Sequence, residues 1–252
     1  MILGLLTPDA GHIELFGEIQ NRSKPSFLSR IGALIERPDF YLYLSAYRNL
    51  ELMMRYSGLT PNQAQIMNIL EWVGLAERAK SAVKTFSHGM KQRLGIAQTL
   101  LHEPDLIILD EPVNGLDPQG IKDIRDLILR LNRDLGKTLI ISSHILREME
   151  LIANRMVVIN RGEVVVEGEV KKLLSEGSQR VILVCDQAEA ALKLLSSHFP
   201  DHRFELNTLG EIHSFAATPV VVEFNRLLVQ NNFQVRQLAT QNSLEDYFLN
   251  IT

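Results

Sequence analysis

Between residues 86 and 142 the chain alternates helical and strand-like apolar patterns. Apolar side chains at helical spacing predict helices over 90–101 and 121–131, whereas 106–110 and 138–142 are short continuous apolar runs. Strands that are apolar along their length and are joined by helices indicate a parallel sheet covered on both faces. The pattern therefore predicts an α/β fold.

The residues before this region combine strand-like segments with a helical insertion. Residues 11–17 alternate like a strand, and 31–36 form a second short strand. Residues 38–85 are mostly helical, and together with the following helix they define an inserted helical subdomain of about 38–105. Within it, Thr60 is expected to cap a helix whose first residue is Pro61.

The last third of the chain carries a different pattern. Residues 156–160 and 163–167 look like the two strands of a hairpin. Residues 175–178 read as a linker. Beyond it, strand-like and helical segments alternate up to an amphipathic segment at 243–250. Residues 178–252 are therefore expected to form a small α+β domain, with a ferredoxin-like fold as one candidate.

The composition limits the function classes. The chain has 252 residues and a net charge of −4, which weakens a nucleic-acid interpretation, because phosphate backbones are bound by concentrated basic surfaces. The single cysteine, Cys185, lies in an apolar run and is expected to be a buried thiol, which fits a reducing cytoplasm. No apolar run approaches the roughly 20 residues that span a bilayer. A role at a membrane would therefore require a partner.

Two adjacent carboxylates, Asp110 and Glu111, follow the apolar strand 106–110. In parallel sheets, ligands bind at the carboxyl ends of the strands. Hydrolysis of ATP needs one carboxylate to hold Mg²⁺ and another group to orient or deprotonate water. An isolated Asp-Glu pair would favour a solvated turn, but the sequence Asn114-Gly-Leu-Asp117-Pro that follows favours a functional site.

Two further segments are ambiguous when taken alone. Residues 87–93, Ser-His-Gly-Met-Lys-Gln-Arg, open a helix. There Ser87 is either a simple N-cap or part of a helix start whose backbone N–H groups bind phosphate oxygen. His144 follows strand 138–142, and a lone histidine is usually structural or solvated.

Together and in this order, these segments resemble the signature loop, Walker B segment and switch histidine of the ABC-type ATPases. The resemblance covers residues 1–170 and implies a P-loop NTPase-like nucleotide-binding domain over 1–174, with ATP and Mg²⁺ as cofactors. It assigns Glu111 and His144 to catalysis and Asp110 and Glu36 to the metal. It assigns the nucleotide contacts to Ser87, Gly89, Met90, Lys91 and Asp117.

Three positions depart from the usual family pattern. His88 and Met90 stand where the family has a second glycine and a glutamine, which changes the side-chain contacts and leaves the backbone contacts. Glu36 stands where the family has a glutamine that touches Mg²⁺. An exposed carboxylate at a strand end is the alternative interpretation of Glu36.

The resemblance also implies partners. These are a membrane-spanning permease and a second ATPase subunit in a head-to-tail dimer, with the chain peripheral on the inner face of the cell membrane. The closing segment 243–249 is similar to exporters of the bacitracin-resistance and lantibiotic-immunity type, which implies export of drugs or antimicrobial peptides. Four aromatic residues beside Glu36 are either core residues or a groove for a permease helix. They are Phe40, Tyr41, Tyr43 and Tyr47.

The sequence contains no glycine-rich phosphate loop of this family. Gly136-Lys137-Thr138 lacks the required earlier glycine and precedes a strand instead of a helix. The chain is therefore interpreted as a truncated ATPase subunit, and the alternative is a catalytically dead subunit that only docks on a membrane partner. Residues 1–252 alone are expected not to bind Mg-ATP usefully. Missing strands are expected to uncover apolar surface beside strand 106–110.

Overall fold

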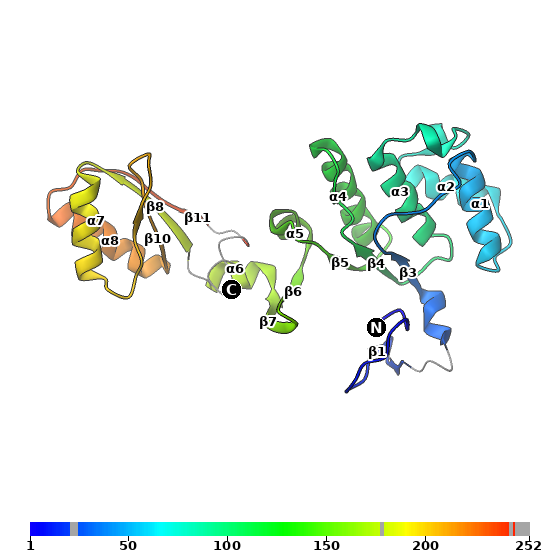
Figure 1. Cartoon of the computed structure of the whole chain (residues 1–252), viewed down its shortest axis with the longest axis horizontal. Coiled ribbons are helices and arrows are strands. Elements are labelled where there is room, and N and C mark those ends of the chain that lie inside the picture. Colours follow the sequence, from blue (N-terminus) through cyan, green and yellow to red (C-terminus); the bar gives the residue numbers. More distant parts are fainter. Residues whose placement is uncertain (21–24, 177–178, 242–243, 245–252) are drawn as a thin grey trace. The chain divides into compact units, whose positions relative to one another are not determined.

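The computed structural model describes residues 1–20, 25–176, 179–241 and 244 (Figure 1). Its contacts divide the chain into two compact units, Met1–His144 and Ile145–Thr252. Within the described ranges, none of the helices is both long and apolar enough to cross a bilayer.

The first unit is built on a parallel sheet of three strands in the order β3-β4-β5. The strands are β3 (Ile31–Leu34), β4 (Leu106–Asp110) and β5 (Thr138–Ser142). Leu34 pairs with Leu109, and Asp110 pairs with Ser142, so the carboxyl ends of the three strands meet at one edge. The parallel sheet predicted from the apolar runs is confirmed.

The sequence predicted uncovered apolar surface beside strand 106–110, and that location was wrong. β4 is the central strand, because β3 pairs with one of its edges and β5 with the other. Burial instead alternates along β5, where Ile140 is 43% exposed. Among the described residues, β5 pairs with β4 alone.

Two helices pack against this sheet and carry residues of the site. α3 (His88–Thr99) packs on β3 at backbone distance, because a β-carbon at Gly32 would lie only 2.4 Å from the Thr99 carbonyl oxygen. α4 (Pro118–Arg133) is amphipathic, with a buried stripe that repeats every three or four residues. The stripe consists of Ile124, Leu127, Ile128 and Leu131.

The inserted helical part contains α1 (Ala46–Tyr56) and α2 (Gln63–Trp72), which pack on each other and on α3 (Figure 1). Its caps differ from the prediction. Asn62, and not Thr60, caps α2, because the Asn62 side chain accepts from the backbone N–H groups of Ala64 and Gln65 at 2.9 and 3.2 Å. Two short 3-10 helices follow, η2 (Ala76–Arg78) and η3 (Val83–Thr85).

The N-terminal segment forms a small hairpin and not the single strand predicted over 11–17. β1 (Glu14–Leu15) and β2 (Glu18–Ile19) pair antiparallel. The chain reverses at Phe16 and Gly17, whose φ angles are 56° and 80°. Gly17 adopts this left-handed conformation readily because it has no β-carbon. The 3-10 helix η1 (Pro25–Arg30) leads into β3.

The second unit begins with α5 (Leu146–Ile152) and the hairpin of β6 (Arg155–Asn160) and β7 (Glu163–Glu169). The strands turn at Arg161 and Gly162, as the sequence predicts. α6 (Val170–Glu176) follows the hairpin.

The rest of this unit is a ferredoxin-like βαββαβ fold, which confirms that candidate. Its antiparallel sheet has the order β11-β8-β10-β9, and α7 and α8 cover the same face (Figure 1). Cys185 is buried in its core, as expected, and burial raises the pKa of the thiol. The amphipathic segment predicted at 243–250 lies outside the described residues, apart from Leu244. The elements are β8 (Gln179–Cys185), α7 (Ala188–His198), β9 (Glu205–Leu206), β10 (Ile212–Ala216), α8 (Thr218–Gln230) and β11 (Val235–Gln241).

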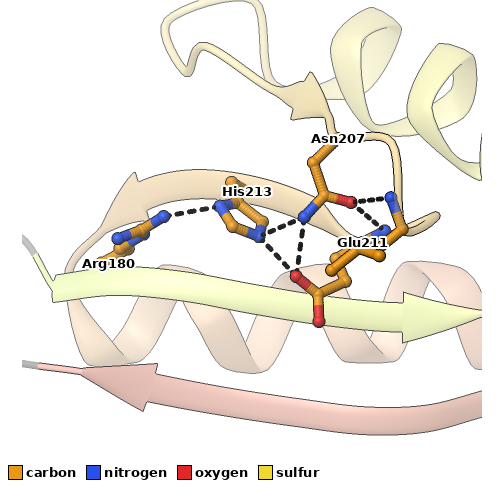
Figure 2. A network of polar contacts seen from close by, with 5 residues as sticks. Arg180, Asn207, Glu211 and His213 are labelled. Carbon is orange, nitrogen blue, oxygen red and sulfur yellow. Dashed lines mark hydrogen bonds and ion pairs between the residues drawn. The ribbon is translucent and has the colours of Figure 1, made fainter.

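A polar network joins β8, β10 and the turn before β10 (Figure 2). An Arg180 N–H donates to Nδ1 of His213 at 2.9 Å, so Nε2 of this ring carries the proton and donates to Glu211 at 3.1 Å. Asn207 donates to the same Glu211 oxygen at 2.7 Å. These hydrogen bonds, first that from His213, lower the pKa of the Glu211 carboxyl.

Candidate functional site

The two carboxylates predicted from the sequence lie at the carboxyl end of β4 and are fixed by the end of β5. The hydroxyl of Ser142 donates to Oδ1 of Asp110. The backbone N–H of Glu111 donates to Ser142, both to the carbonyl oxygen at 3.2 Å and to Oγ at 3.1 Å. Ser142 therefore binds the side chain of Asp110 and the backbone N–H of Glu111.

The chain turns sharply at Glu111. Its φ of 47° is a left-handed conformation that is uncommon for a residue with a side chain. Strained residues of this kind persist where the surroundings fix them, and they gather at functional sites. Here the hydrogen bonds to Ser142 and a backbone bond from the N–H of Asn114 to the Glu111 carbonyl, at 3.1 Å, hold the turn.

The turn brings Glu111 to His144. Nδ1 of His144 lies 2.9 Å from Oε2 of Glu111, and the side chains are 65% and 31% exposed. Because the carboxylate only accepts, Nδ1 carries the proton and donates it to this bond. The ring is thus fixed in one orientation, with its Nε2 atom on the opposite side.

The start of α3 is a capped helix N-terminus. Oγ of Ser87 accepts from the Met90 N–H at 3.2 Å, and the Ser87 carbonyl accepts from the Lys91 N–H at 3.0 Å. Among the described residues, the N–H groups of His88 and Gly89 have no hydrogen-bond partner. Unused N–H groups at a helix start bind anions.

The start of α4 lies against the start of α3. A β-carbon at Gly89 would lie 3.8 Å from Cα of Gly120 and 3.9 Å from Cδ2 of Leu116. Asp117, which the resemblance places at the nucleotide, is the N-cap of α4, and its Oδ1 accepts from the Gly120 N–H at 3.0 Å. Its contact with nucleotide stays a prediction.

Glu36 follows β3 on the same sheet edge. It is exposed, with a φ of 56°, and among the described residues no hydrogen bond joins its side chain to Asp110, Glu111 or His144. The structure therefore brings together Asp110, Glu111 and His144, and it does not join Glu36 to them by a direct bond.

The donor set suits a magnesium ion that arrives with a nucleotide. No group of three or more Asp, Glu, His or Cys side chains in the described ranges is arranged to hold a metal by itself. Mg²⁺ typically takes one or two carboxylates and completes its shell with water and phosphate oxygens. Asp110 fits this role, because the Ser142 hydroxyl occupies Oδ1 and leaves Oδ2 available.

Comparison with known proteins decides the family. The family model described as "ABC transporter" matches residues 1–114. The chain is also 39% identical over 252 residues to the bacitracin transport ATP-binding protein BcrA of Bacillus licheniformis, covering all of this chain and 82% of that protein. The chain belongs to the ABC transporter family. It is an ATP-binding, ATP-hydrolysing subunit, as the resemblance implies.

Other relatives of this ABC transporter subunit support the same family assignment. It is 41% identical over 169 residues to the lantibiotic transport ATP-binding protein SrtF of Streptococcus pyogenes, covering 67% of this chain and 71% of SrtF. The solved structure of CbiO1 from Clostridium perfringens, described as part of the ABC transporter complex CbiONQ, is similar with a TM-score of 0.62 and 25% identity. The similarity covers 79% of this chain and 76% of CbiO1. The predicted fold class is confirmed.

Two features of the site in this ABC transporter subunit were not predicted from the sequence. They are the hydrogen bonds of Ser142 and the direct contact between Glu111 and His144. The sequence held a signal for both, because Ser142 ends the strand that pairs with the carboxylate-bearing strand and His144 follows two residues later. Strand order was the information needed to join them.

Proposed function

We propose that Glu111 is the residue that orients and activates the attacking water in ATP hydrolysis, and that His144 fixes it. The observation that supports this is the 2.9 Å hydrogen bond between His144 Nδ1 and Glu111 Oε2, directly beside Asp110. The bond occupies one carboxylate oxygen and leaves Oε1 to accept a hydrogen bond from water. A held carboxylate of this kind is the geometry that general-base catalysis requires.

The other groups bind and orient the nucleotide. Asp110 holds Mg²⁺, which neutralises charge on the phosphates when bound. Nε2 of His144 points away from Glu111 and is the atom that contacts the γ-phosphate. The unused N–H groups at the start of α3 bind phosphate of a nucleotide held by a second subunit, so the working form is a head-to-tail dimer.

A membrane-spanning permease is the second partner. Of the four aromatic residues expected beside Glu36, Tyr41 and Tyr43 are exposed, whereas Phe40 and Tyr47 are half-buried. The two exposed residues and Tyr56, which we call the aromatic patch, support this partner, and Tyr43 is 73% exposed. The side chain of the buried Asn49 exchanges two hydrogen bonds with the backbone of Tyr41, at 2.9 and 3.1 Å, and so holds the loop in place. Rigid exposed aromatic side chains anchor interfaces. The chain thus lies on the inner face of the membrane through this partner.

The proposed cargo is a drug or antimicrobial peptide. The relatives named for bacitracin and for lantibiotic transport support it. The proposed nucleotide-binding part is 1–174, with its helical subdomain at about 38–105, and 178–252 form the small α+β domain. The ferredoxin-like fold supports the second boundary, because its first strand begins at Gln179.

Glu111→Gln tests the catalytic assignment. The test uses a version of the subunit that is supplied with a glycine-rich phosphate loop of this family, which we call the loop-supplied subunit. Cells that produce it with its permease are challenged with bacitracin and with a lantibiotic, and ATPase activity and ATP binding are measured on the purified complex. The substitution keeps the shape of the side chain and removes its basicity, so turnover falls about 100-fold or more while ATP binding is retained. Resistance is lost with turnover.

Glu103→Gln is the matched control, because this exposed residue lies before the opposite end of β4. It leaves turnover and resistance unchanged. Full resistance in Glu111→Gln cells would overturn the catalytic assignment and favour the alternative, a subunit that acts only by docking on the permease.

A further inference from the structure

His88, the first residue of α3, turns its ring toward the turn that follows Glu111. Nε2 of His88 lies 3.3 Å from the carbonyl oxygen of Asn114. A β-carbon at Gly115 would lie 3.7 Å from the same Nε2 atom and 3.9 Å from Cδ2. The edge of the His88 ring therefore contacts the backbone at Asn114 and Gly115.

The direction of this hydrogen bond follows from its atoms. A carbonyl oxygen only accepts, so Nε2 carries the hydrogen and donates it. The N–H of Asn114 in turn donates to the Glu111 carbonyl at 3.1 Å. Asn114 therefore accepts from the start of α3 and donates to the residue that carries the catalytic carboxylate.

Among the described residues, this is the one side-chain hydrogen bond between segments 86–91 and 111–117. The neighbouring contact of Gly89 with Gly120 and Leu116 is van der Waals contact without direction. Packing keeps the start of α3 close to the turn at 111–117, and the directional hydrogen bond of His88 fixes the orientation of the turn relative to α3.

We propose that His88 is a positioning residue that couples the phosphate-facing start of α3 to the turn bearing Glu111. The inference rests on the proposed function, because it gives Glu111 the role of activating water. Glu111 sits in a left-handed conformation that its surroundings must hold, and His88 holds the far end of that turn. His88 thereby acts on the rate of hydrolysis through Glu111, without itself touching the reacting atoms.

The test compares His88→Leu with His88→Gln in the loop-supplied subunit, assembled with its permease. Leucine cannot donate a hydrogen bond, whereas the glutamine amide can. Loss of one neutral hydrogen bond corresponds to a fall in kcat of about five-fold for His88→Leu. KM for ATP stays within about two-fold, and His88→Gln retains at least about half of the parent kcat.

His102 offers a matched control, because its Nε2 also contacts a backbone carbonyl, that of Ile31 at 2.9 Å, away from the carboxylates. His102→Gln leaves kcat unchanged. In folded His88→Leu, amide hydrogen exchange accelerates at residues 111–116, and this readout is available even if assembly with the permease is impaired.

The outcomes separate this inference from the proposed function. Parent-like kcat and exchange in His88→Leu, with Glu111→Gln inactive, would overturn the coupling and leave the role of Glu111 standing. Equal loss in His88→Leu and His88→Gln, with a raised KM, would also overturn it, because the ring would then bind phosphate directly. An active Glu111→Gln enzyme would instead refute the proposed function.

Discussion

The hydroxyl of Ser142, at the end of β5, donates a hydrogen bond to the carboxylate of Asp110, at the end of β4. The two residues are register partners in the parallel sheet, so the contact follows from strand pairing and not from a flexible loop. The same hydroxyl accepts from the Glu111 N–H at 3.1 Å. One small side chain thus orients the proposed magnesium ligand and the proposed catalytic residue together.

Ser142→Ala is expected to lower kcat about ten-fold and to raise the Mg²⁺ concentration needed for half-maximal activity. The change removes the donor to the Asp110 carboxylate. A hydrogen bond to a charged group contributes about 1.5–3 kcal/mol, and solvent reduces that value here because the bond is exposed. The measurement is ATPase activity of the transporter assembled with the loop-supplied subunit, over a magnesium titration. Thr138→Ala, at the other end of β5, is the control and keeps the parent's magnesium dependence.

In the loop-supplied subunit, His144→Ala is expected to reduce hydrolysis strongly while leaving folding and ADP affinity nearly unchanged. The imidazole is 65% exposed, so its removal leaves no cavity in the core. Its proposed contact is with the γ-phosphate, which ADP lacks. Thermal unfolding checks that folding is unchanged, and calorimetric titration with ADP checks that ADP affinity is unchanged. A large loss of ADP binding would contradict the prediction and indicate a structural histidine.

Tyr43→Ala is expected to weaken co-purification of the permease without lowering the temperature of unfolding. The side chain is 73% exposed, so it contributes little to the core, and its ring packs edge-on against Tyr41 with centroids 6.1 Å apart. Leu209→Ala is the control, since Leu209 is 81% exposed and lies outside the aromatic patch. Equal recovery of permease with both variants would argue against the aromatic patch as the docking site.

The sequence predicted the parts of the site that are local in the chain. An apolar run followed by Asp110 and Glu111 indicates a strand with carboxylates at its end, and Asp117 before Pro118 indicates a capped helix. Both hold in the structure, because burial and capping act over a few residues. The bond between Glu111 and His144 depends on which strands are neighbours, which the chain order alone does not determine.

Misplaced boundaries have a similar origin. Thr60 and Asn62 are both good N-cap residues, and the choice between them depends on which side chain reaches two N–H groups. Residues 11–17 alternate like a strand, but the positive φ of Phe16 and Gly17 folds them into a turn. Local preference permits both structures in each case, and the three-dimensional arrangement selects one.

The network of Figure 2 gives a prediction for the ferredoxin-like fold. The pKa of Glu211 is lowered below its ordinary value of 4.5, mainly by the hydrogen bond from His213, so the charged form stabilises the folded state. This stabilisation is present above about pH 4.5 and is lost as pH falls through the lower folded pKa. His213→Phe should therefore raise the pKa of Glu211, measured by NMR titration of its carboxyl carbon. His198→Phe, which removes a histidine that contacts Leu194 and not Glu211, should leave that pKa where it is, and an equal rise in both variants would refute the assignment.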